Sequence, residues 1–110
     1  MEQLLSQIGI RLLERRKQLH LTQEQLADLA GITPQTVSTA ETGRKALRPE
    51  NIVRLCEALG VSTDYLLKGE VTGADQSMLY QKISQLPSAP YRHLEDIIDS
   101  YIAAINEREA

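Results

Sequence analysis

The stretch TQEQLADLAGITPQTVSTAETG, residues 22–43, carries the strongest structural signals in the chain. Thr22 and Gln25 have the spacing of a capping box, in which a hydroxyl and an amide each satisfy a free backbone N–H at a helix start. Gly31 stands where the chain must turn, most easily with positive φ. Thr33 before Pro34 is a good N-cap before a first helical residue. These signals predict two short helices joined by a turn of about three residues, over about residues 22–30 and 34–42.

Two helices joined by so short a turn cross steeply, which is the helix-turn-helix arrangement. A close crossing needs small side chains at the contact, and Ala27, Ala30 and Ala40 supply them. On the first of the two helices, Leu26, Leu29 and Ala30 are predicted to face inward. On the turn and the second helix, the inward residues are predicted to be Ile32, Val37 and Ala40.

The opposite face of the second helix is polar but almost uncharged. Gln35, Ser38, Thr39 and Thr42 recur at helical spacing and so share one face. A helix fits the major groove of B-DNA, where amide and hydroxyl groups can read the base edges. Arg44 and Lys45 beyond its end would then hold the phosphate backbone. The alternative is an ordinary surface helix, but the tight turn, the small contact residues and the flanking cations together favour DNA recognition.

Bulk properties fit a cytoplasmic DNA-binding protein. The chain has 110 residues, no Trp or Phe, and a net charge of −3. Residues 1–69 hold nine Lys and Arg against eight Asp and Glu, so the acidity belongs to residues 70–110, and local patches decide which partner is attracted. We expect no signal peptide and no membrane span. Cys56 is a lone cysteine, expected to be a small buried hydrophobe, and no metal or other cofactor is expected.

Helical periodicity runs through the rest of the chain, so the predicted fold class is all-α. A first helix is expected over about residues 4–19, and two more over 49–59 and 63–67 after the basic loop. The predicted domains are a helix-turn-helix domain (1–69), a linker (70–75) and a C-terminal helical hairpin (76–110). The hairpin helices are expected over about residues 76–86 and 90–108.

The last predicted helix carries an apolar stripe typical of a helix that packs on another helix. Its members recur every three or four residues: Tyr91, Leu94, Ile98, Tyr101 and Ile105. Self-association through this segment is favoured over packing within the chain, because a dimer would fix the spacing of two half-sites on DNA.

From Ile8 to about Leu67 the chain resembles the Cro/repressor-like helix-turn-helix family, also called the XRE family. The resemblance is carried by motifs along these 60 or so residues: Ile8-Gly9, Arg16, Leu21-Thr22-Gln23-x-x-Leu26-Ala27, Gly31-Ile32-Thr33, Val37-Ser38, Glu41-x-Gly43, Pro49, Leu59-Gly60-Val61-Ser62 and Tyr65-Leu66-Leu67. It implies a five-helix domain that binds double-stranded DNA, usually as a homodimer on a palindromic operator.

The resemblance also implies roles for individual residues. Those expected at the bases are Pro34, Gln35, Thr36, Ser38 and Thr39. Those expected at phosphates are Gln23, Thr42, Arg44, Lys45 and Arg48. An ion pair between Arg16 and Glu41 is implied as a tie between the first and third helices, although an ordinary surface pair is the alternative. Arg11 and Lys17 are expected to be solvated. The stem of Arg15 is expected to cover the core, while its charge reaches solvent or phosphate.

Other functional classes are weaker. His20 and His93 lie far apart in the sequence, and no nucleophile and base, Gly-rich phosphate loop or carboxylate pair can be assigned, so an enzyme is not expected. A transcriptional regulator, most simply a repressor, is the favoured function. The alternative is an antitoxin that binds a toxin protein through the acidic tail and represses its own operon.

Overall fold

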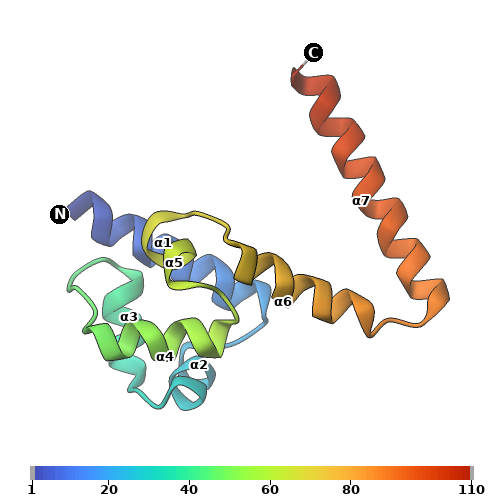
Figure 1. Cartoon of the computed structure of the whole chain (residues 1–110). Coiled ribbons are helices and arrows are strands. Elements are labelled where there is room, and N and C mark those ends of the chain that lie inside the picture. Colours follow the sequence, from blue (N-terminus) through green and yellow to red (C-terminus); the bar gives the residue numbers. More distant parts are fainter. Residues whose placement is uncertain (1, 110) are drawn as a thin grey trace. The chain divides into compact units, whose positions relative to one another are not determined.

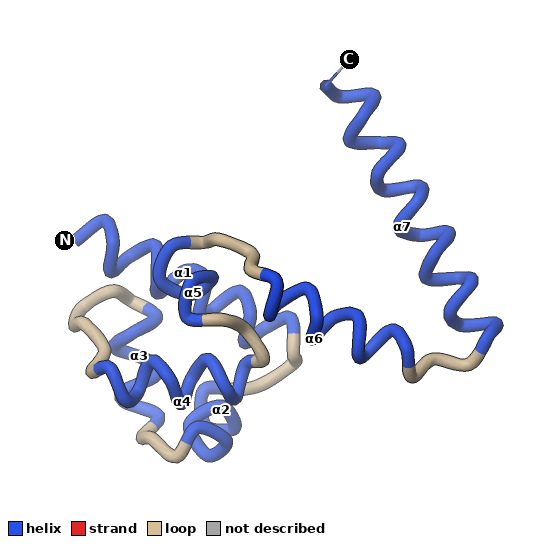
Figure 2. Tube along the Cα trace, viewed as in Figure 1, coloured by secondary structure: helices blue, strands red, loops and turns tan. Residues whose placement is uncertain are grey.

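The computed structural model describes residues 2–109, and their regular structure is helical throughout (Figures 1 and 2). The chain divides into two compact units, residues 1–76 and 77–110. The helices, in chain order, are α1 (Glu2–Gln18), α2 (Gln23–Ala30), α3 (Pro34–Glu41), α4 (Pro49–Leu59), α5 (Thr63–Lys68), α6 (Gly73–Ser84) and α7 (Ser88–Glu109). The all-α fold and the order of its helices agree with the prediction from sequence. Among the described residues, no helix is long and apolar enough to cross a membrane.

In the first unit, helices α1 to α5 surround one small aliphatic core. Its buried members are Leu12, Leu26, Ala27, Ala30, Val37, Ala40, Leu55, Cys56, Leu59 and Leu66. Burial raises the pKa of the Cys56 thiol to about 11, so this cysteine packs as a hydrophobe, as predicted. One core prediction was wrong: Leu29 is 63% exposed, because the eight-residue α2 buries only the face that carries Leu26, Ala27 and Ala30.

Helices α1 and α3 approach each other closely because residue 9 has no side chain. Gly9 lies in the middle of α1, against the C-terminal end of α3. A Cβ atom placed there would lie 2.5 Å from the carbonyl oxygen of Glu41 and 2.6 Å from that of Ala40. Since both atoms belong to the backbone, no side-chain rotation can relieve such a contact. Gly9 therefore sets the separation between α1 and α3.

Two arginines of α1 close the ends of other helices. The Arg11 guanidinium donates to the carbonyl oxygens of Leu66 (2.8 Å) and Leu67 (2.9 Å) at the end of α5. Arg15 donates to the carbonyl oxygen of Leu59, the last residue of α4, at 3.0 Å. Cations are favoured at helix C-termini, where carbonyl groups are left without partners. The expectation that Arg11 is solvated was therefore wrong. Arg15 also donates through Nη1 to the exposed Gln18 side chain at 3.3 Å, so the outer part of its guanidinium lies at the surface, as expected.

The start of α6 belongs to the first unit. Asp75 accepts hydrogen bonds from the backbone N–H of Ser62 (2.7 Å) and the Ser62 hydroxyl (2.6 Å). It also accepts from the N–H and hydroxyl of Thr72, at 2.9 and 3.0 Å. Ser62 is itself the N-cap of α5, so one carboxylate joins the starts of two helices. Helix α6 begins at Gly73, so its first three residues fall within the segment 70–75 expected to be the linker.

The second unit holds the rest of α6 and all of α7, and it exposes most of its apolar side chains. Side chains with at least a third of their surface exposed include Leu79, Tyr80, Leu86, Tyr91, Ile97, Ile98, Tyr101 and Ile102. Among residues 77–108, none is buried. This unit therefore does not bury its own apolar surface in the way the first unit does.

Candidate nucleic-acid interface

The two helices of the helix-turn-helix are delimited by their own side chains. The Thr22 hydroxyl accepts from the N–H of Gln25 at 3.0 Å, and the Gln25 amide oxygen accepts from the N–H of Thr22 at 2.9 Å. Gly31 ends α2 with φ of +70°. The Thr33 hydroxyl caps α3 by accepting from the N–H of Thr36 at 3.2 Å. Each of these caps was predicted from the sequence.

Helix α3 buries Val37 and Ala40 and turns its polar face outward. Of the residues expected to read bases, Pro34 and Gln35 are exposed, whereas Thr36, Ser38 and Thr39 are half-buried. Thr42, expected at a phosphate, is exposed just after the helix. The structure thus brings the predicted base-reading residues together on one short helix.

The threonine hydroxyls of this face donate within the helix. The Thr39 hydroxyl donates to the carbonyl oxygen of Gln35. The Thr42 hydroxyl lies 3.2 Å from the carbonyl oxygen of Ser38 and 3.0 Å from that of Thr39. In this arrangement, both threonines offer a methyl group and oxygen lone pairs to a partner rather than a hydroxyl proton. An exposed amide that can both donate and accept is supplied by Gln35.

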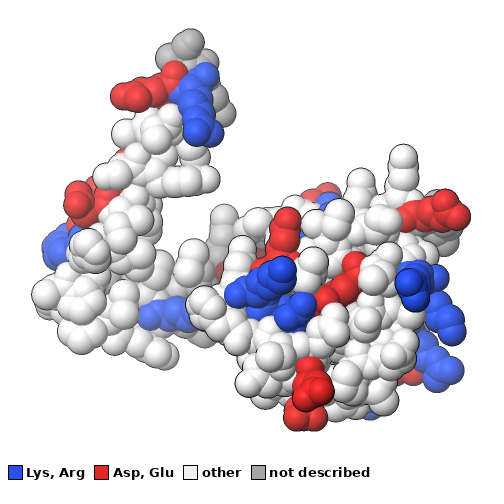
Figure 3. Space-filling model, turned by 180° about the vertical axis from the view of Figure 1, so that it is seen from behind, with Lys and Arg blue, Asp and Glu red and all other residues white. Residues whose placement is uncertain are grey.

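Exposed cations gather on the loop between α3 and α4, at the right edge of Figure 3. They are Arg44, Lys45 and Arg48, the three basic residues expected at phosphates. A cleft of about 530 Å³ runs between α3 and this loop, and Asn51 and Arg54 of α4 also line it. Sequence reasoning missed these two residues, although their spacing of three places them on the same face of α4.

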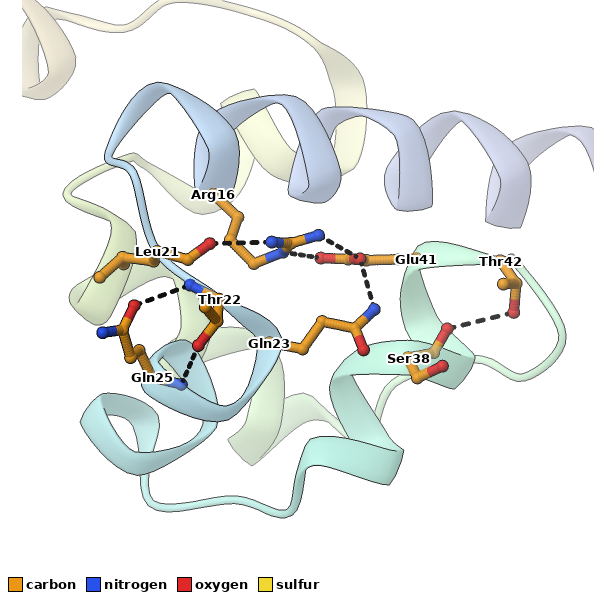
Figure 4. A network of polar contacts seen from close by, with 8 residues as sticks. All are labelled: Arg16, Leu21, Thr22, Gln23, Gln25, Ser38, Glu41 and Thr42. Carbon is orange, nitrogen blue, oxygen red and sulfur yellow. Dashed lines mark hydrogen bonds and ion pairs between the residues drawn. The ribbon is translucent and has the colours of Figure 1, made fainter.

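A partly buried network of hydrogen bonds joins α1, α2 and α3 (Figure 4). Arg16 donates to both carboxylate oxygens of Glu41, at 2.6 and 3.1 Å, and to the carbonyl oxygen of Leu21 at 2.8 Å. The Gln23 amide also donates to Glu41, at 3.0 Å. The side chains of Arg16 and Glu41 are only 11% and 5% exposed. The implied ion pair is therefore formed, and it is buried rather than an ordinary surface pair.

Comparisons with known proteins agree with this geometry. Residues 12–66 match the helix-turn-helix family. The chain is 30% identical over 94 residues to the Cryptic phage CTXphi transcriptional repressor RstR of Vibrio cholerae, covering 84% of each protein. It is 31% identical over 102 residues to the SPbeta prophage-derived uncharacterized HTH-type transcriptional regulator YonR of Bacillus subtilis, covering 93% of this chain and 84% of YonR.

The fold is also that of a solved repressor. The crystal structure of the P22 c2 repressor protein in complex with synthetic operator 9T matches 57% of this chain and 96% of its own, with 36% identity and a TM-score of 0.56. These relatives are regulators and give no support to the antitoxin alternative. Since the family match spans half of the chain and a repressor is similar along most of it, the chain belongs to the Cro/repressor-like (XRE) helix-turn-helix family of DNA-binding transcriptional regulators.

Proposed function

We propose that this protein is a transcriptional repressor that binds a palindromic operator as a homodimer, with α3 of each copy in the major groove. The observation that carries the proposal is the combination on the α3 side of the first unit. An uncharged polar helix face stands outward, and three exposed cations follow it on the next loop. Base edges are read by amide and hydroxyl groups, whereas lysine and arginine hold phosphates.

The relatives support the DNA-binding part of this proposal. The P22 c2 repressor was solved with a synthetic operator, and the RstR protein is a transcriptional repressor. By similarity, we assign base contacts to Pro34, Gln35, Thr36, Ser38 and Thr39. Phosphate contacts are assigned to Gln23, Thr42, Arg44, Lys45 and Arg48. Both the backbone N–H and the hydroxyl of Thr42 donate to carbonyl oxygens of α3, so a phosphate contact by Thr42 requires its hydroxyl to rotate away from the helix.

Selection of bound DNA from a random duplex pool tests this proposal directly. We expect two short inverted half-sites with a fixed spacing near one helical turn. The Gln35→Ala variant should relax the preference at one base pair per half-site by about 1–3 kcal/mol, because a paired amide is lost there. Enrichment of no sequence would refute the proposal, and an unchanged motif in the variant would remove Gln35 from base reading.

The dimer part of the proposal is supported by the apolar surface of the second unit. A hollow of about 410 Å³ between α6 and α7 is lined by Tyr80, Ile83, Tyr91, Leu94 and Ile98, among others. Large exposed apolar patches are typical of protein–protein interfaces. A second copy of the same segment would cover them, with Tyr91, Leu94, Ile98, Tyr101 and Ile105 at the contact.

Two matched isoleucine substitutions locate the dimer contact. Ile98 on α7 is 41% exposed, and Ile10 on α1 is 52% exposed. We expect Ile98→Asp to give monomers in sedimentation at micromolar concentration, whereas Ile10→Asp should leave the dimer intact. The reverse outcome would place the dimer interface on the first unit, and a monomeric wild type would refute dimerisation by the free protein.

A further inference from the structure

The contact between Gln23 and Glu41 was not predicted from the sequence. Gln23 is the first residue of α2, and Glu41 is the last residue of α3. The Gln23 Nε2 atom donates to Glu41 Oε1 at 3.0 Å, and Figure 4 shows the two side chains pointing toward one another. The contact therefore joins Gln23, which is expected to bind a phosphate, to the carboxylate of Glu41.

This contact selects one orientation of the Gln23 amide. A carboxylate only accepts hydrogen bonds, whereas an amide has a donating NH₂ edge and an accepting oxygen. Turning the Gln23 oxygen toward Glu41 would set two acceptors against each other. Nε2 carries two hydrogens, so one remains after the contact with Glu41 is made. That second N–H is the group that a phosphate oxygen requires.

A carboxylate close to a phosphate would ordinarily repel it, but here the charge is compensated. Arg16 binds Glu41 through two hydrogen bonds, and a third bond from Arg16 to the Leu21 carbonyl oxygen holds the guanidinium in place. The pair is buried and has no net charge. Glu41 can therefore orient Gln23 without placing an unbalanced negative charge at the DNA surface.

We propose that Glu41 is a positioning residue for DNA binding, which holds Gln23 so that its free N–H meets a phosphate at the start of α2. The proposal rests on the proposed DNA-binding function. An open hollow lies on this side of the unit, lined by Arg16, His20, Leu21, Thr22, Gln23 and Glu24. The hollow gives a phosphate access both to Gln23 and to the N-terminal turn of α2, where anions are favoured.

A cycle of variants tests the coupling. The double substitution Arg16→Met with Glu41→Leu removes the hold on Gln23 while leaving the net charge unchanged. Replacing a buried ion pair by apolar side chains of similar size is often neutral or stabilising. Affinity for the selected operator is measured for wild type, Gln23→Ala, the double variant and the combination of all three, with thermal unfolding confirming that each is folded.

We expect Gln23→Ala and the double variant each to weaken binding by about 10-fold, the typical effect of one charge-assisted hydrogen bond. The combination of all three substitutions should weaken binding no further, because all of them remove the same contact. A double variant that binds like wild type, or a combination in which the two losses multiply, would overturn the proposal while leaving DNA binding itself intact. A wild type that binds no duplex DNA would instead refute the proposed function.

A measurement on wild type keeps the test independent of whether the variants fold. In ¹⁵N–¹H spectra of the free protein, one Gln23 side-chain amide proton should show slow solvent exchange, whereas both protons of the exposed Gln35 should exchange rapidly. Addition of operator should shift the other Gln23 proton. Two rapidly exchanging Gln23 protons, or no shift with operator, would overturn the positioning role.

Discussion

Gly9→Ala should destabilise the protein even though alanine is the better helix former. Gly9 lies in the middle of α1, where replacing glycine by alanine ordinarily gains about 1 kcal/mol. Here the new Cβ would lie 2.5 Å from the Glu41 carbonyl oxygen, about 1 Å closer than the 3.4 Å at which ordinary contact begins. The clash can be relieved only if α1 and α3 move apart, because the atoms that the new Cβ meets belong to the backbone.

The size of the effect follows from these opposing contributions. Overpacking a close contact costs about 1–3 kcal/mol, and occasionally more, when the neighbouring backbone has to shift. Because two backbone oxygens would lie within 2.6 Å of the new Cβ, we expect a cost in the upper part of this range, about 2–3 kcal/mol. After the helix-propensity gain, the net loss in the free energy of unfolding should be about 1–2 kcal/mol, measured by urea denaturation. The affinity for DNA should fall as well, because a shift of the end of α3 would displace Glu41, which we propose positions Gln23 at a phosphate.

Gly73→Ala is the matched control for this prediction. Gly73 is also helical, but a Cβ atom placed there meets nothing within 4 Å. This substitution should leave the free energy of unfolding unchanged or raise it by up to about 1 kcal/mol. If Gly9→Ala were as stable as wild type, the inference that α1 and α3 are too close to admit a side chain at residue 9 would be refuted.

Three further predictions concern charged residues. Arg16→Met alone should lower the free energy of unfolding by about 3–5 kcal/mol in urea denaturation, because Glu41 is left buried without a cation; the same change at the exposed Arg92 should have little effect. Lys45→Ala should weaken binding to all DNA sequences alike and make the slope of log affinity against log salt shallower by about 0.9, as seen in titrations at several salt concentrations. Asp75→Asn should lower stability by about 1.5–3 kcal/mol at pH 7. Burial alone would raise the pKa of Asp75, but hydrogen bonds from Ser62 and Thr72 outweigh it and lower the pKa to about 2. The carboxylate therefore stabilises the fold above its usual pKa of 3.8, and this stability is lost as the pH falls through about 2, so thermal unfolding of wild type and variant should converge in acid.

The parts of the fold that follow from local chemistry were predictable from the sequence. The capping box at Thr22 and Gln25, the turn at Gly31 and the Thr33-Pro34 helix start each act within a few residues, so their spacing alone placed α2 and α3. The outward polar face of α3 followed from the same helical spacing. Its contacts with DNA stay predictions.

The parts that depend on distant partners were not predictable in this way. Arg11 and Arg15 bind carbonyl groups 55 and 44 residues away, and nothing in the local pattern distinguishes such arginines from solvated ones. Leu29 was misplaced because an eight-residue helix has too few apolar positions to define its buried face. The hydrogen bond between Gln23 and Glu41 likewise forms only when α1, α2 and α3 are packed together.

The bonds between Ser62, Thr72 and Asp75 decide where this chain can be cut and rejoined. The family match ends at residue 66, which suggests grafting a foreign C-terminal segment directly after α5. Such a chimaera would lack Asp75, whose carboxylate accepts a hydrogen bond from Ser62, the N-cap residue of α5. Fusion after Gln76 would keep that partner, so the transferable module of this protein ends ten residues beyond the end of its family match.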